Sequence, residues 1–302
     1  MSWRNVADWA KRRAIVLRLA DRLGRGRGRL RWMDRLGEIP PAPAVPTFER
    51  WEDCRVAATW IGHATVLLRM EGMTILTDPV FSSRVGVGLG FMTGGPLRLV
   101  RPAVTLRQLP KLDLILLSHA HFDHIDLPTL DRLDRRTPIV TAHHTQDLVR
   151  ALGFSRLTEL RWGERHTIGP LQITAVPARH WGARTFFDMH RGFNAYLLQT
   201  PRRRVLYGGD TAYHDGFAEA GRVDLAILGI GAYNPYVAAH ATPEQALAMA
   251  NQVHAERIFP MHHSTFRLSY ESINEPIERL LDAVKDEQRV IIRRVGEQWA
   301  DG

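Results

Sequence analysis

One stretch of nine residues, 118–126, restricts the fold of this chain more than any other part of the sequence. It reads Ser-His-Ala-His-Phe-Asp-His-Ile-Asp and follows an apolar run at residues 112–117 that is typical of a buried strand. Where a strand ends, the chain leaves the sheet and neighbouring side chains can turn toward one point. Imidazole and carboxylate groups suit zinc, and also iron or manganese. A lone His-x-His pair would favour an ordinary polar loop, but the complete string favours a metal site.

Three later segments repeat this arrangement, in which an apolar strand is followed by a side chain of a metal-ligand type. His180 and His262 each follow a short apolar run. Asp210 follows the run at residues 204–207, behind two glycines that allow the backbone to approach a site closely. We therefore predict that these three side chains meet the histidine-rich string in space.

The rest of the chain has the pattern of a mixed α/β protein. Hydrophobic residues make up 45% of the sequence and charged residues 24%, an ordinary balance for a folded protein. Strands are predicted at residues 56–61, 65–70, 74–77, 112–117, 139–142, 171–175, 194–199, 204–207, 225–228, 257–259 and 290–294. Helices are predicted at residues 127–133, 145–152, 243–253 and 277–285, and a long loop at residues 82–101. This pattern fits a two-sheet sandwich with outer helices, although periodicity alone does not single out that fold.

The first 49 residues differ from the rest of the chain. Residues 1–36 contain eleven of the 40 basic side chains and three of the 32 acidic ones, so they account for the whole formal net charge of +8. Helical spacing predicts an amphipathic helix over residues 2–23 and a second short helix over residues 30–36. Four prolines between residues 40 and 46 predict an extended linker. We therefore divide the chain into a basic arm with its linker, residues 1–49, and one main domain, residues 50–302.

The charge distribution and the cysteine content restrict partners and location. Because residues 37–302 carry balanced charges, no nucleic-acid-binding face is expected on the main domain. The basic helix suits an anionic membrane surface, packing on the domain, or packing on a second subunit in a homodimer, and the sequence leaves these open. Cys54 is the only cysteine, which indicates a reducing compartment. We expect a cytoplasmic protein, with any membrane contact peripheral, at the inner face and through the arm.

Seven segments together resemble the metallo-β-lactamase superfamily, and more narrowly N-acylphosphatidylethanolamine-hydrolysing phospholipase D and its bacterial relatives. The segments are residues 59–65, 76–83, 118–126, 177–181, 208–211, 240–246 and 262–266. The string Thr-Asp-Pro-Val-Phe-Ser-Ser at residues 77–83 and the late His-x-x-Thr-Phe are narrower than the others and point to the phospholipase-like branch. The resemblance implies an α/β fold of the four-layer αββα type, with two mixed sheets and outer helices.

Carried over position by position, the resemblance implies a centre of two zinc ions, for which iron or manganese can substitute. The first cation has the implied ligands His119, His121 and His180. The second has the implied ligands Asp123, His124 and His262, and Asp210 bridges the two. His262 is chosen over His263 because the family ligand stands three residues before the Thr-Phe pair, and His263 stands where the phospholipase commonly has an aromatic residue.

Further residues are expected beside the cations. His240 matches a family position that lines the site, so substrate contact or support of a ligand is favoured over simply starting a helix. His63 is expected to orient a ligand or to pack under the site. Asp78 is expected to hydrogen-bond a ligand histidine. The remaining histidines, at positions 143, 144, 166, 190, 214 and 254, are expected on the surface or in structural roles.

The resemblance also implies a reaction. A hydroxide shared by the two cations would attack phosphorus or an acyl carbon, and a hydrogen bond to Asp123 would aim it. Asp123 and His240 are therefore the candidate catalytic residues. The expected substrate is a phosphodiester in a phospholipid such as an N-acylated phosphatidylethanolamine, and the alternative is a soluble lactonase or phosphodiesterase that acts on a small ester.

Three other classes of protein are disfavoured. A nuclease does not fit the balanced charge of the main domain, because a nucleic-acid groove is normally basic. A non-catalytic binding protein does not fit the presence of competent side chains at all seven ligand positions. Cleavage of antibiotics does not fit the phospholipase-like segments.

Overall fold

The computed structural model describes residues 39–49, 51, 54–88, 93–185 and 187–301. The helices predicted at residues 2–23 and 30–36 lie outside these residues. The described residues of the predicted linker contact residues that come much later in the chain. The Arg101 side chain donates a hydrogen bond from Nε to the carbonyl of Ile39 over 2.7 Å, and the amide of Ala44 donates to the carbonyl of Val295 over 3.3 Å.

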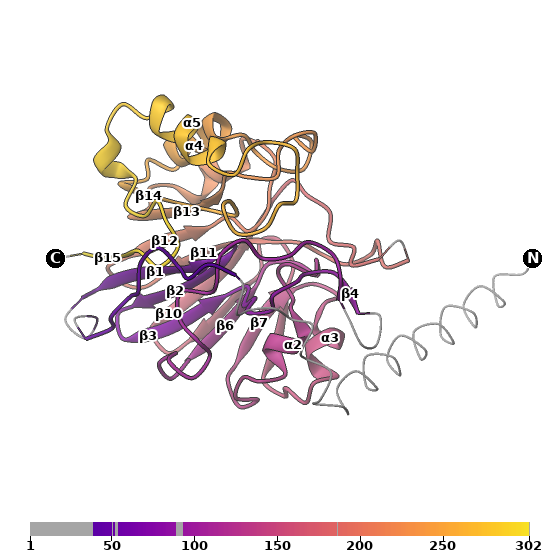
Figure 1. Cartoon of the computed structure of the whole chain (residues 1–302). Coiled ribbons are helices and arrows are strands. Elements are labelled where there is room, and N and C mark those ends of the chain that lie inside the picture. The colour runs from indigo at the N-terminus through magenta and orange to yellow at the C-terminus, as the bar shows by residue number, and fades with distance from the viewer. Residues whose placement is uncertain (1–38, 50, 52–53, 89–92, 186, 302) are drawn as a thin grey trace, which may run out of the picture.

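Two mixed β-sheets lie face to face in the described part of the chain (Figure 1). The first sheet has the strand order β15 (Gln298–Ala300), β1 (Val56–Gly62), β2 (Thr65–Met70), β3 (Met73–Thr77), β6 (Leu114–Leu117), β7 (Ile139–Ala142) and β8 (Leu157–Leu160). The second has the order β14 (Arg257–Met261), β13 (Leu225–Gly229), β12 (Arg204–Tyr207), β11 (Ala195–Gln199), β10 (Leu171–Val176) and β9 (Arg165–Ile168). A short hairpin pairs β4 (Val87–Gly88) with β5 (Thr93–Gly94).

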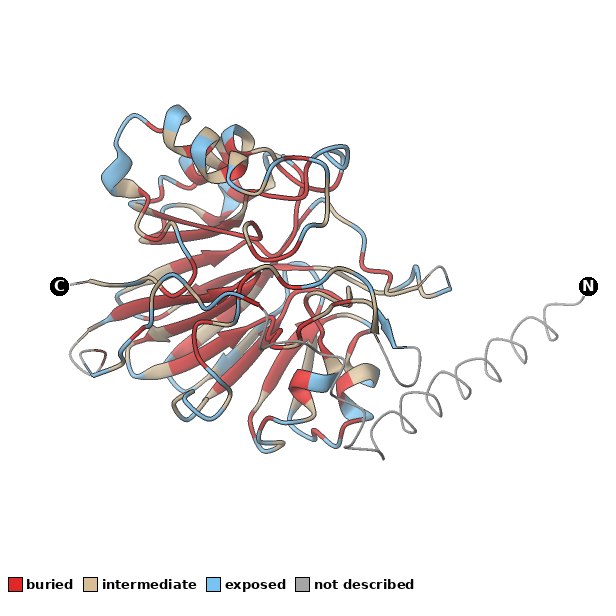
Figure 2. Ribbon diagram, in the orientation of Figure 1, coloured by how far each residue is buried: buried red, intermediate tan, exposed pale blue. Residues whose placement is uncertain are grey.

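The strands are apolar on both faces because both faces of each sheet are covered. In β6, Leu114 and Leu116 belong to the core between the two sheets, whereas Ile115 and Leu117 belong to the core on the outer face of the first sheet. The second sheet contributes Tyr196 from β11 and other side chains to the same central core. Figure 2 shows both sheets as largely buried. Full burial of each aliphatic side chain contributes roughly 1.5–3 kcal/mol, which fixes the register of these strands.

Helices cover the two outer faces and complete four layers. The helices on the first sheet are α2 (Leu127–Leu130) and α3 (Gln146–Arg150), and those on the second are η4 (Gly216–Ala220), α4 (Pro243–Gln252) and α5 (Glu275–Ala283). The predicted N-cap of α4 is present, because the Thr242 side chain accepts from the amide of Gln245 in a capping box. The predicted αββα sandwich is thereby confirmed. Among the described residues, no helix has both the length and the apolar character needed to cross a bilayer.

Most predicted elements occur within a few residues of their predicted bounds, but the end of the chain was predicted wrongly. Residues 290–294 do not form the last strand. Only Val290 makes an isolated parallel bridge there, after the short helical turn η5 (Glu287–Arg289), and β15 is the last strand. The Glu297 carboxylate accepts hydrogen bonds from the amides of Arg293 and Arg294, and this turn precedes the pairing of β15 with β1.

Four further strands besides β15 were not predicted, and two helices were predicted too long. The strands β8 and β9 mix polar and apolar residues, most of them partly or fully exposed, and therefore lack an apolar run. The hairpin of β4 and β5 lies within the predicted loop at residues 82–101 and has two residues in each strand. The helices α2 and α3 are single turns, so helical spacing in the sequence overstated their length.

The strand directions bring the ends of six strands to corresponding edges of the sheets. Strands β1 and β3 are both antiparallel to β2, and β3 is parallel to β6, so β1, β3 and β6 run in one direction. By the same reasoning β10, β12 and β14 run in one direction in the second sheet. In such sheets, binding sites form outside the carboxyl ends of the strands. The side chains that follow these six strands are His63, Asp78, His119, His180, Asp210 and His262.

Candidate metal centre

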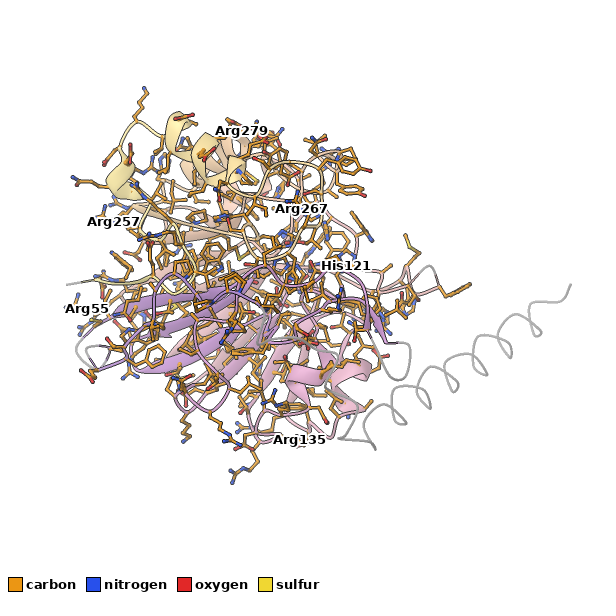
Figure 3. All side chains as sticks on the ribbon, viewed as in Figure 1. Arg55, His121, Arg135, Arg257, Arg267 and Arg279 are labelled. Carbon is orange, nitrogen blue, oxygen red and sulfur yellow. The ribbon has the colours of Figure 1, made fainter. Side chains whose placement is uncertain are left out.

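The seven side chains predicted as ligands lie together where strands of both sheets end. With His63 they make up two groups of four, and a third group joins His240 to Asp210 and His262; the ligand atoms within each group lie within 4.8 Å of one another. The first group consists of His119, His121, His180 and Asp210, and the second consists of His63, Asp123, His124 and His262. Figure 3 places His121 at the junction of the two sheets. The predicted meeting of distant strand ends therefore occurs, with His63 as an additional member.

Asp210 connects the two groups. Its Oδ2 atom lies 3.1 Å from Nε2 of both His124 and His262, and 3.9 Å from Nε2 of both His119 and His180. The side chain is 2% exposed. A single carboxylate thus faces ligand nitrogens from both groups, which is the position that a bridging ligand requires.

Gly209 allows Asp210 to reach this position. Its backbone has a φ of 55°, in the left-handed region that glycine adopts without steric cost. A Cβ atom at this residue would lie 2.8 Å from the Cβ of Ser118 and 3.0 Å from the carbonyl oxygen of Asn194. The glycine therefore permits the close approach of two segments that carry ligands.

Asp78 organises the buried side of the centre, as the sequence predicted. Its carboxylate is fully buried and accepts from the Ser118 amide over 2.7 Å, the Ser118 hydroxyl over 2.5 Å, the Tyr207 hydroxyl over 2.6 Å and His124 Nδ1 over 2.7 Å. Donation by Nδ1 leaves Nε2 of His124, the nitrogen that faces Asp210, as the ring atom that can bind a cation. Burial lowers the pKa of His124, but Asp210, Asp78 and Asp123 outweigh it and raise this pKa well above its ordinary value, so a cation here would replace a proton. Carboxylate–imidazole pairs of this kind orient a ligand histidine and raise its basicity.

The hydrogen bonds of two other histidines fix their tautomers in the same way. The Ser118 hydroxyl gives its proton to Asp78, so it accepts from Nδ1 of His119, 2.9 Å away. Nδ1 of His180 donates to the carbonyl of Ala239 over 2.9 Å. Both residues therefore present Nε2 lone pairs, and these nitrogens lie 2.9 Å and 3.3 Å from Nδ1 of His121.

These residues fit a divalent cation, on the ground of their unsatisfied buried atoms. Among the described residues, no side chain or backbone group makes a hydrogen bond of acceptable geometry with Nε2 of His124, Nε2 of His262 or Oδ1 of Asp210, all of which are buried. Buried polar groups of this kind are normally paired. Converging lone pairs repel one another unless a proton or a cation lies between them. Imidazole and carboxylate donors are the set that zinc and similar cations take.

The electrostatics of the cluster agree with this geometry. Burial raises the pKa of Asp123 and Asp210, but nearby imidazoles outweigh it, so both pKa values lie well below the ordinary value. Burial and neighbouring imidazoles hold the pKa of His119 well below its ordinary value. Burial also lowers the pKa of His262, but Asp210 and Asp123 outweigh it and raise it to about 9. The carboxylates of Asp123 and Asp210 are therefore anionic at neutral pH and are stabilised by nearby positive charge, which a bound cation would supply.

His63 and His262 lie against each other beneath the second group. Nε2 of His63 is 2.9 Å from Oδ2 of Asp123, so it orients that carboxylate as predicted for a residue that supports a ligand. Its ring centroid is 4.1 Å from that of His262. His63, Asp78 and His262 all have positive φ, at 57°, 31° and 62°. Such backbone costs of order 1–3 kcal/mol at each residue and persists where the surroundings enforce it.

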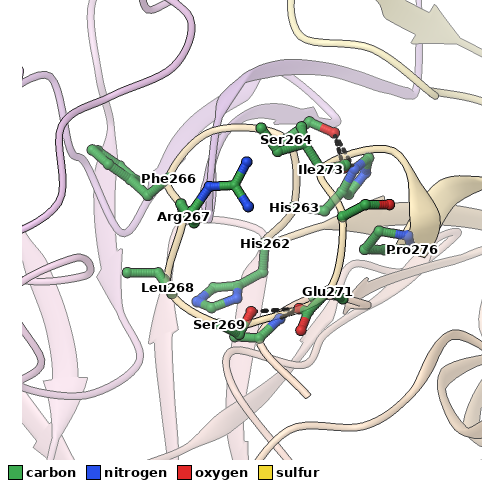
Figure 4. A pocket seen from close by; sticks show the side chains of 13 residues that line it. His262, His263, Ser264, Phe266, Arg267, Leu268, Ser269, Glu271, Ile273 and Pro276 are labelled. Atoms are coloured by element: carbon green, nitrogen blue, oxygen red, sulfur yellow. Dashed lines mark hydrogen bonds between the residues drawn. The ribbon is translucent and has the colours of Figure 1, made fainter. Parts of the chain in front are cut away.

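The two adjacent histidines at the end of β14 have different environments, and Figure 4 shows their rings pointing in different directions. The ring of His263 lies 4.5 Å from the indole of Trp60, and its Nδ1 hydrogen-bonds with the hydroxyl of Ser264 over 2.8 Å. Burial lowers the pKa of His263 to about 3, so the ring is neutral. His263 therefore packs as an aromatic ring, whereas His262 faces Asp210.

His240 lies at the edge of the centre, as the family resemblance implied for a residue that lines the site. Its Nδ1 is 3.8 Å from Oδ2 of Asp210, and its ring lies 5.0 Å from that of His180 and 6.3 Å from that of Trp181. Burial lowers the pKa of His240 to about 4, against an opposing effect of Asp210. His240 is therefore a neutral hydrogen-bonding group beside the cluster.

Two residues that support Asp78 through their hydroxyls, Ser118 and Tyr207, were not predicted. Ser118 directly follows β6 and Tyr207 is the last residue of β12. A polar side chain at the end of a mostly apolar strand is a signal that could have found them. Among the remaining histidines, His143, His144 and His190 have neighbouring rings, with centroids 3.6 Å and 5.4 Å apart, and none of the three belongs to a group of possible ligands among the described residues. His144 and His190 are exposed and His143 is partly buried, as expected for surface or structural residues.

Comparisons with known proteins identify the family. Residues 73–263 match the β-lactamase superfamily domain. The chain is 35% identical over 263 residues to an uncharacterized protein of Mycobacterium tuberculosis, with 82% of this chain and 70% of that protein covered. It is 30% identical over 269 residues to N-acyl-phosphatidylethanolamine-hydrolyzing phospholipase D 1 of Caenorhabditis elegans, with 80% and 75% covered.

Two further comparisons agree on the class of protein. A protein of Exiguobacterium named as a metal-dependent hydrolase is 30% identical over 217 residues, with 69% of this chain and 86% of that protein covered. The solved structure of a possible metal-dependent hydrolase from Veillonella parvula has a TM-score of 0.68 at 15% identity, with 82% and 99% covered, and shows the shared fold. The chain belongs to the metallo-β-lactamase superfamily. It is a metal-dependent hydrolase with a histidine and aspartate cluster able to bind metal.

Proposed function

We propose that this protein is a phosphodiesterase with two zinc ions that hydrolyses an N-acylated phosphatidylethanolamine or a closely related phospholipid. The observation that carries the proposal is the position of Asp210 between two groups of imidazole nitrogens; in the second group, nitrogens of His124 and His262 are buried without a hydrogen-bond partner. Two cations fit this arrangement because the ligand atoms form two groups, each compact enough for one cation, and Asp210 faces nitrogens of both groups.

The residues that would hold the cations are those of the two groups. His119, His121 and His180 would hold the first, Asp123, His124 and His262 would hold the second, and Asp210 would contact both. Two bound cations lower the pKa of water from about 15.7 toward about 7 and stabilise negative charge that develops in the reaction. Iron and manganese use the same donor types, and zinc is proposed because nitrogen donors predominate.

Asp123 is proposed as the group that aims the attacking water. Its Oδ2 atom accepts from His63 over 2.9 Å and lies 3.5 Å from Nε2 of His262, which leaves the carboxylate oriented and anionic. With a side-chain exposure of 15%, it is more open than Asp210 at 2%. An anionic oxygen that is held in place and reachable by water suits a hydrogen-bond or proton acceptor.

His240 is proposed to contact the substrate. Its ring stands beside Asp210 and is neutral near pH 7, so a nitrogen can donate a hydrogen bond to a phosphate oxygen or to the departing oxygen. Trp181 lies 4.9 Å from the ring of His121 and is 40% exposed, which offers an apolar surface beside the cluster. A polar donor and an apolar wall match a lipid phosphodiester.

The proposed reaction is a hydrolysis without a covalent enzyme intermediate. The oxygen of water bonds to phosphorus while the bond from phosphorus to the ethanolamine oxygen breaks. The water proton passes to the departing oxygen, so the products are a phosphatidic acid and an N-acylethanolamine. Support for this substrate comes from the relative of Caenorhabditis elegans, whose name states hydrolysis of N-acyl-phosphatidylethanolamine.

The test is hydrolysis by the zinc-loaded full chain of N-acylphosphatidylethanolamine in mixed micelles, followed by phosphorus NMR in water enriched in ¹⁸O. We expect the label in phosphatidic acid, loss of activity on chelation and its return with zinc. The variant Asp123→Asn should lose about 10²–10⁴-fold in kcat, in line with removal of a positioned acid–base group. The variant His166→Ala is the matched control, because His166 lies on β9 and belongs to no group of possible ligands among the described residues, and it should keep activity.

Two outcomes would contradict the proposal. Hydrolysis of lactones or carboxylic esters with no cleavage of phosphodiesters would replace the substrate class with the small-ester alternative. Full activity after rigorous chelation would exclude the proposed metal centre itself.

A further inference from the structure

Arg184 lies close to the metal centre without being one of its ligands. It stands four residues after His180, on the segment that follows β10. A single nitrogen of its guanidinium, Nη1, donates hydrogen bonds to two backbone carbonyls, those of Ala120 over 2.9 Å and Ile125 over 2.8 Å. Hydrogen bonds from a charged donor are among the stronger ones in proteins.

These two carbonyls enclose the ligand-bearing part of the histidine-rich loop. Ala120 lies between His119 and His121, and Ile125 directly follows His124. Because one nitrogen contacts both carbonyls, it holds together two points of the loop that are five residues apart. The backbone that carries His121, Asp123 and His124 is therefore closed into a ring by Arg184.

The guanidinium also stacks on the loop that it closes. Its central carbon lies 4.0 Å from the ring centroid of Phe122, a residue in the middle of that loop. This distance is within the range of a cation–π interaction. Arg184 thus contacts the loop at its beginning, its middle and its end, through two carbonyls and one aromatic ring.

The segment that presents Arg184 is itself held firmly at its base. A Cβ atom on Gly182 would lie 2.3 Å from the carbonyl oxygen of Arg191, so the two ends of this segment touch through their backbones. Arg191 donates two hydrogen bonds to the carboxylate of Asp147 on α3, over 2.6 Å and 3.0 Å, and one to Asp188 over 2.6 Å. The backbone on either side of Arg184 is therefore held in place at Gly182 and Arg191.

We propose that Arg184 is a positioning residue that sets the affinity of the centre for divalent cations, an inference that rests on the proposed metal site. It ties the segment of His180 to the loop of His121, Asp123 and His124, so ligands from separate strands keep one geometry before a cation binds. Preorganised ligands bind a cation more tightly because less backbone ordering accompanies binding. Loss of groups that orient ligands typically lowers metal affinity by about 10–100-fold.

The experiment compares Arg184→Met with Arg135→Met in the full chain. Each change removes one positive charge, its hydrogen bonds to backbone carbonyls and its contact with a phenylalanine ring, and keeps a long apolar side chain, but of these two arginines only Arg184 touches the histidine-rich loop. Zinc affinity is measured by competition with a chromophoric chelator, and the coordination geometry by the visible spectrum of the cobalt-loaded protein. We expect Arg184→Met to lose about 10–100-fold in affinity and to show a changed spectrum. Arg135→Met should stay within about three-fold of the unaltered protein.

The variant Arg184→Lys covers the case in which Arg184→Met does not fold, as judged by circular dichroism. Lysine keeps the charge but lacks the planar guanidinium that stacks on Phe122, so an intermediate loss of affinity is expected. Unaltered zinc affinity and an unaltered cobalt spectrum in the folded Arg184 variants would overturn the inference alone. Failure of the unaltered protein to bind any divalent cation would instead overturn the metal centre.

Discussion

Replacing Asp78 by asparagine should weaken the metal centre although the side chain keeps its shape. The carboxylate accepts four hydrogen bonds, from the Ser118 amide, the Ser118 hydroxyl, the Tyr207 hydroxyl and His124 Nδ1. Asparagine has one oxygen and one NH₂ group, and the NH₂ group cannot accept a hydrogen bond.

Both orientations of the amide damage the site. With NH₂ in place of Oδ1, it would face the Ser118 amide at 2.7 Å, and two donors would oppose each other. With NH₂ in place of Oδ2, the hydroxyls can rotate to accept, but His124 must offer its Nδ1 lone pair. The proton of His124 would then sit on Nε2, where it blocks the nitrogen that faces Asp210.

The magnitude follows from these contacts. At least one hydrogen bond to a charged group is lost, so the free energy of unfolding should fall by about 1.5–3 kcal/mol. Zinc affinity should fall by about 10–100-fold, as for other groups that orient a ligand. Urea denaturation in the absence of metal measures the first quantity, and chelator competition measures the second.

The variant Tyr207→Phe is the matched control. It removes one donor to Asp78, 2.6 Å away, and leaves the contact with His124 intact. We expect a similar loss of stability with zinc affinity within about three-fold of the unaltered protein. Equal zinc affinity in Asp78→Asn and the unaltered protein would refute the reasoning about the His124 tautomer.

Two other predictions follow from the geometry. Gly209→Ala should lower both the melting temperature and zinc affinity, because its Cβ would contact Ser118 at 2.8 Å and φ is positive; unchanged binding and melting would count against the close approach. Burial raises the pKa of Asp188, but hydrogen bonds from Arg191 and Thr185 outweigh it, so its folded-state pKa lies below the unfolded value of about 3.9. The carboxylate therefore stabilises the fold above that pH and loses this effect as pH falls through the folded-state pKa. Asp188→Asn should lower the free energy of unfolding by about 1 kcal/mol at pH 7 in urea denaturation. The difference should begin to shrink near the unfolded-state pKa of about 3.9 and disappear only below the folded-state pKa; a difference independent of pH would contradict this assignment.

Several features of the protein could be predicted from the sequence because they depend on local order along the chain. The histidine-rich string follows a strand that is apolar at every described position from Leu114 to Leu117, and this pattern arises only where both faces of a strand are covered. Each distant ligand likewise follows an apolar run. The capping box of Thr242 is equally local. These signals, together with the resemblance, determined the sandwich and the seven candidate ligands.

Other features depended on contacts between residues far apart in the sequence. The last strand is β15 rather than the predicted residues 290–294, because a turn held by Glu297 precedes it. Its partner β1 lies more than 200 residues earlier in the sequence. The hydroxyl of Tyr207 reaches Asp78 across 129 residues of sequence. No local pattern encodes such distances, because they arise only when the two sheets pack.

The sequence by itself therefore determined which side chains are chemically able to bind a cation and that each follows the end of a strand. Only the tertiary structure decided their tautomers, the central place of Asp210 and the closure of the ligand loop by Arg184. The physical reason is that composition and periodicity report what a residue can do, whereas a hydrogen-bond partner is chosen by packing in three dimensions.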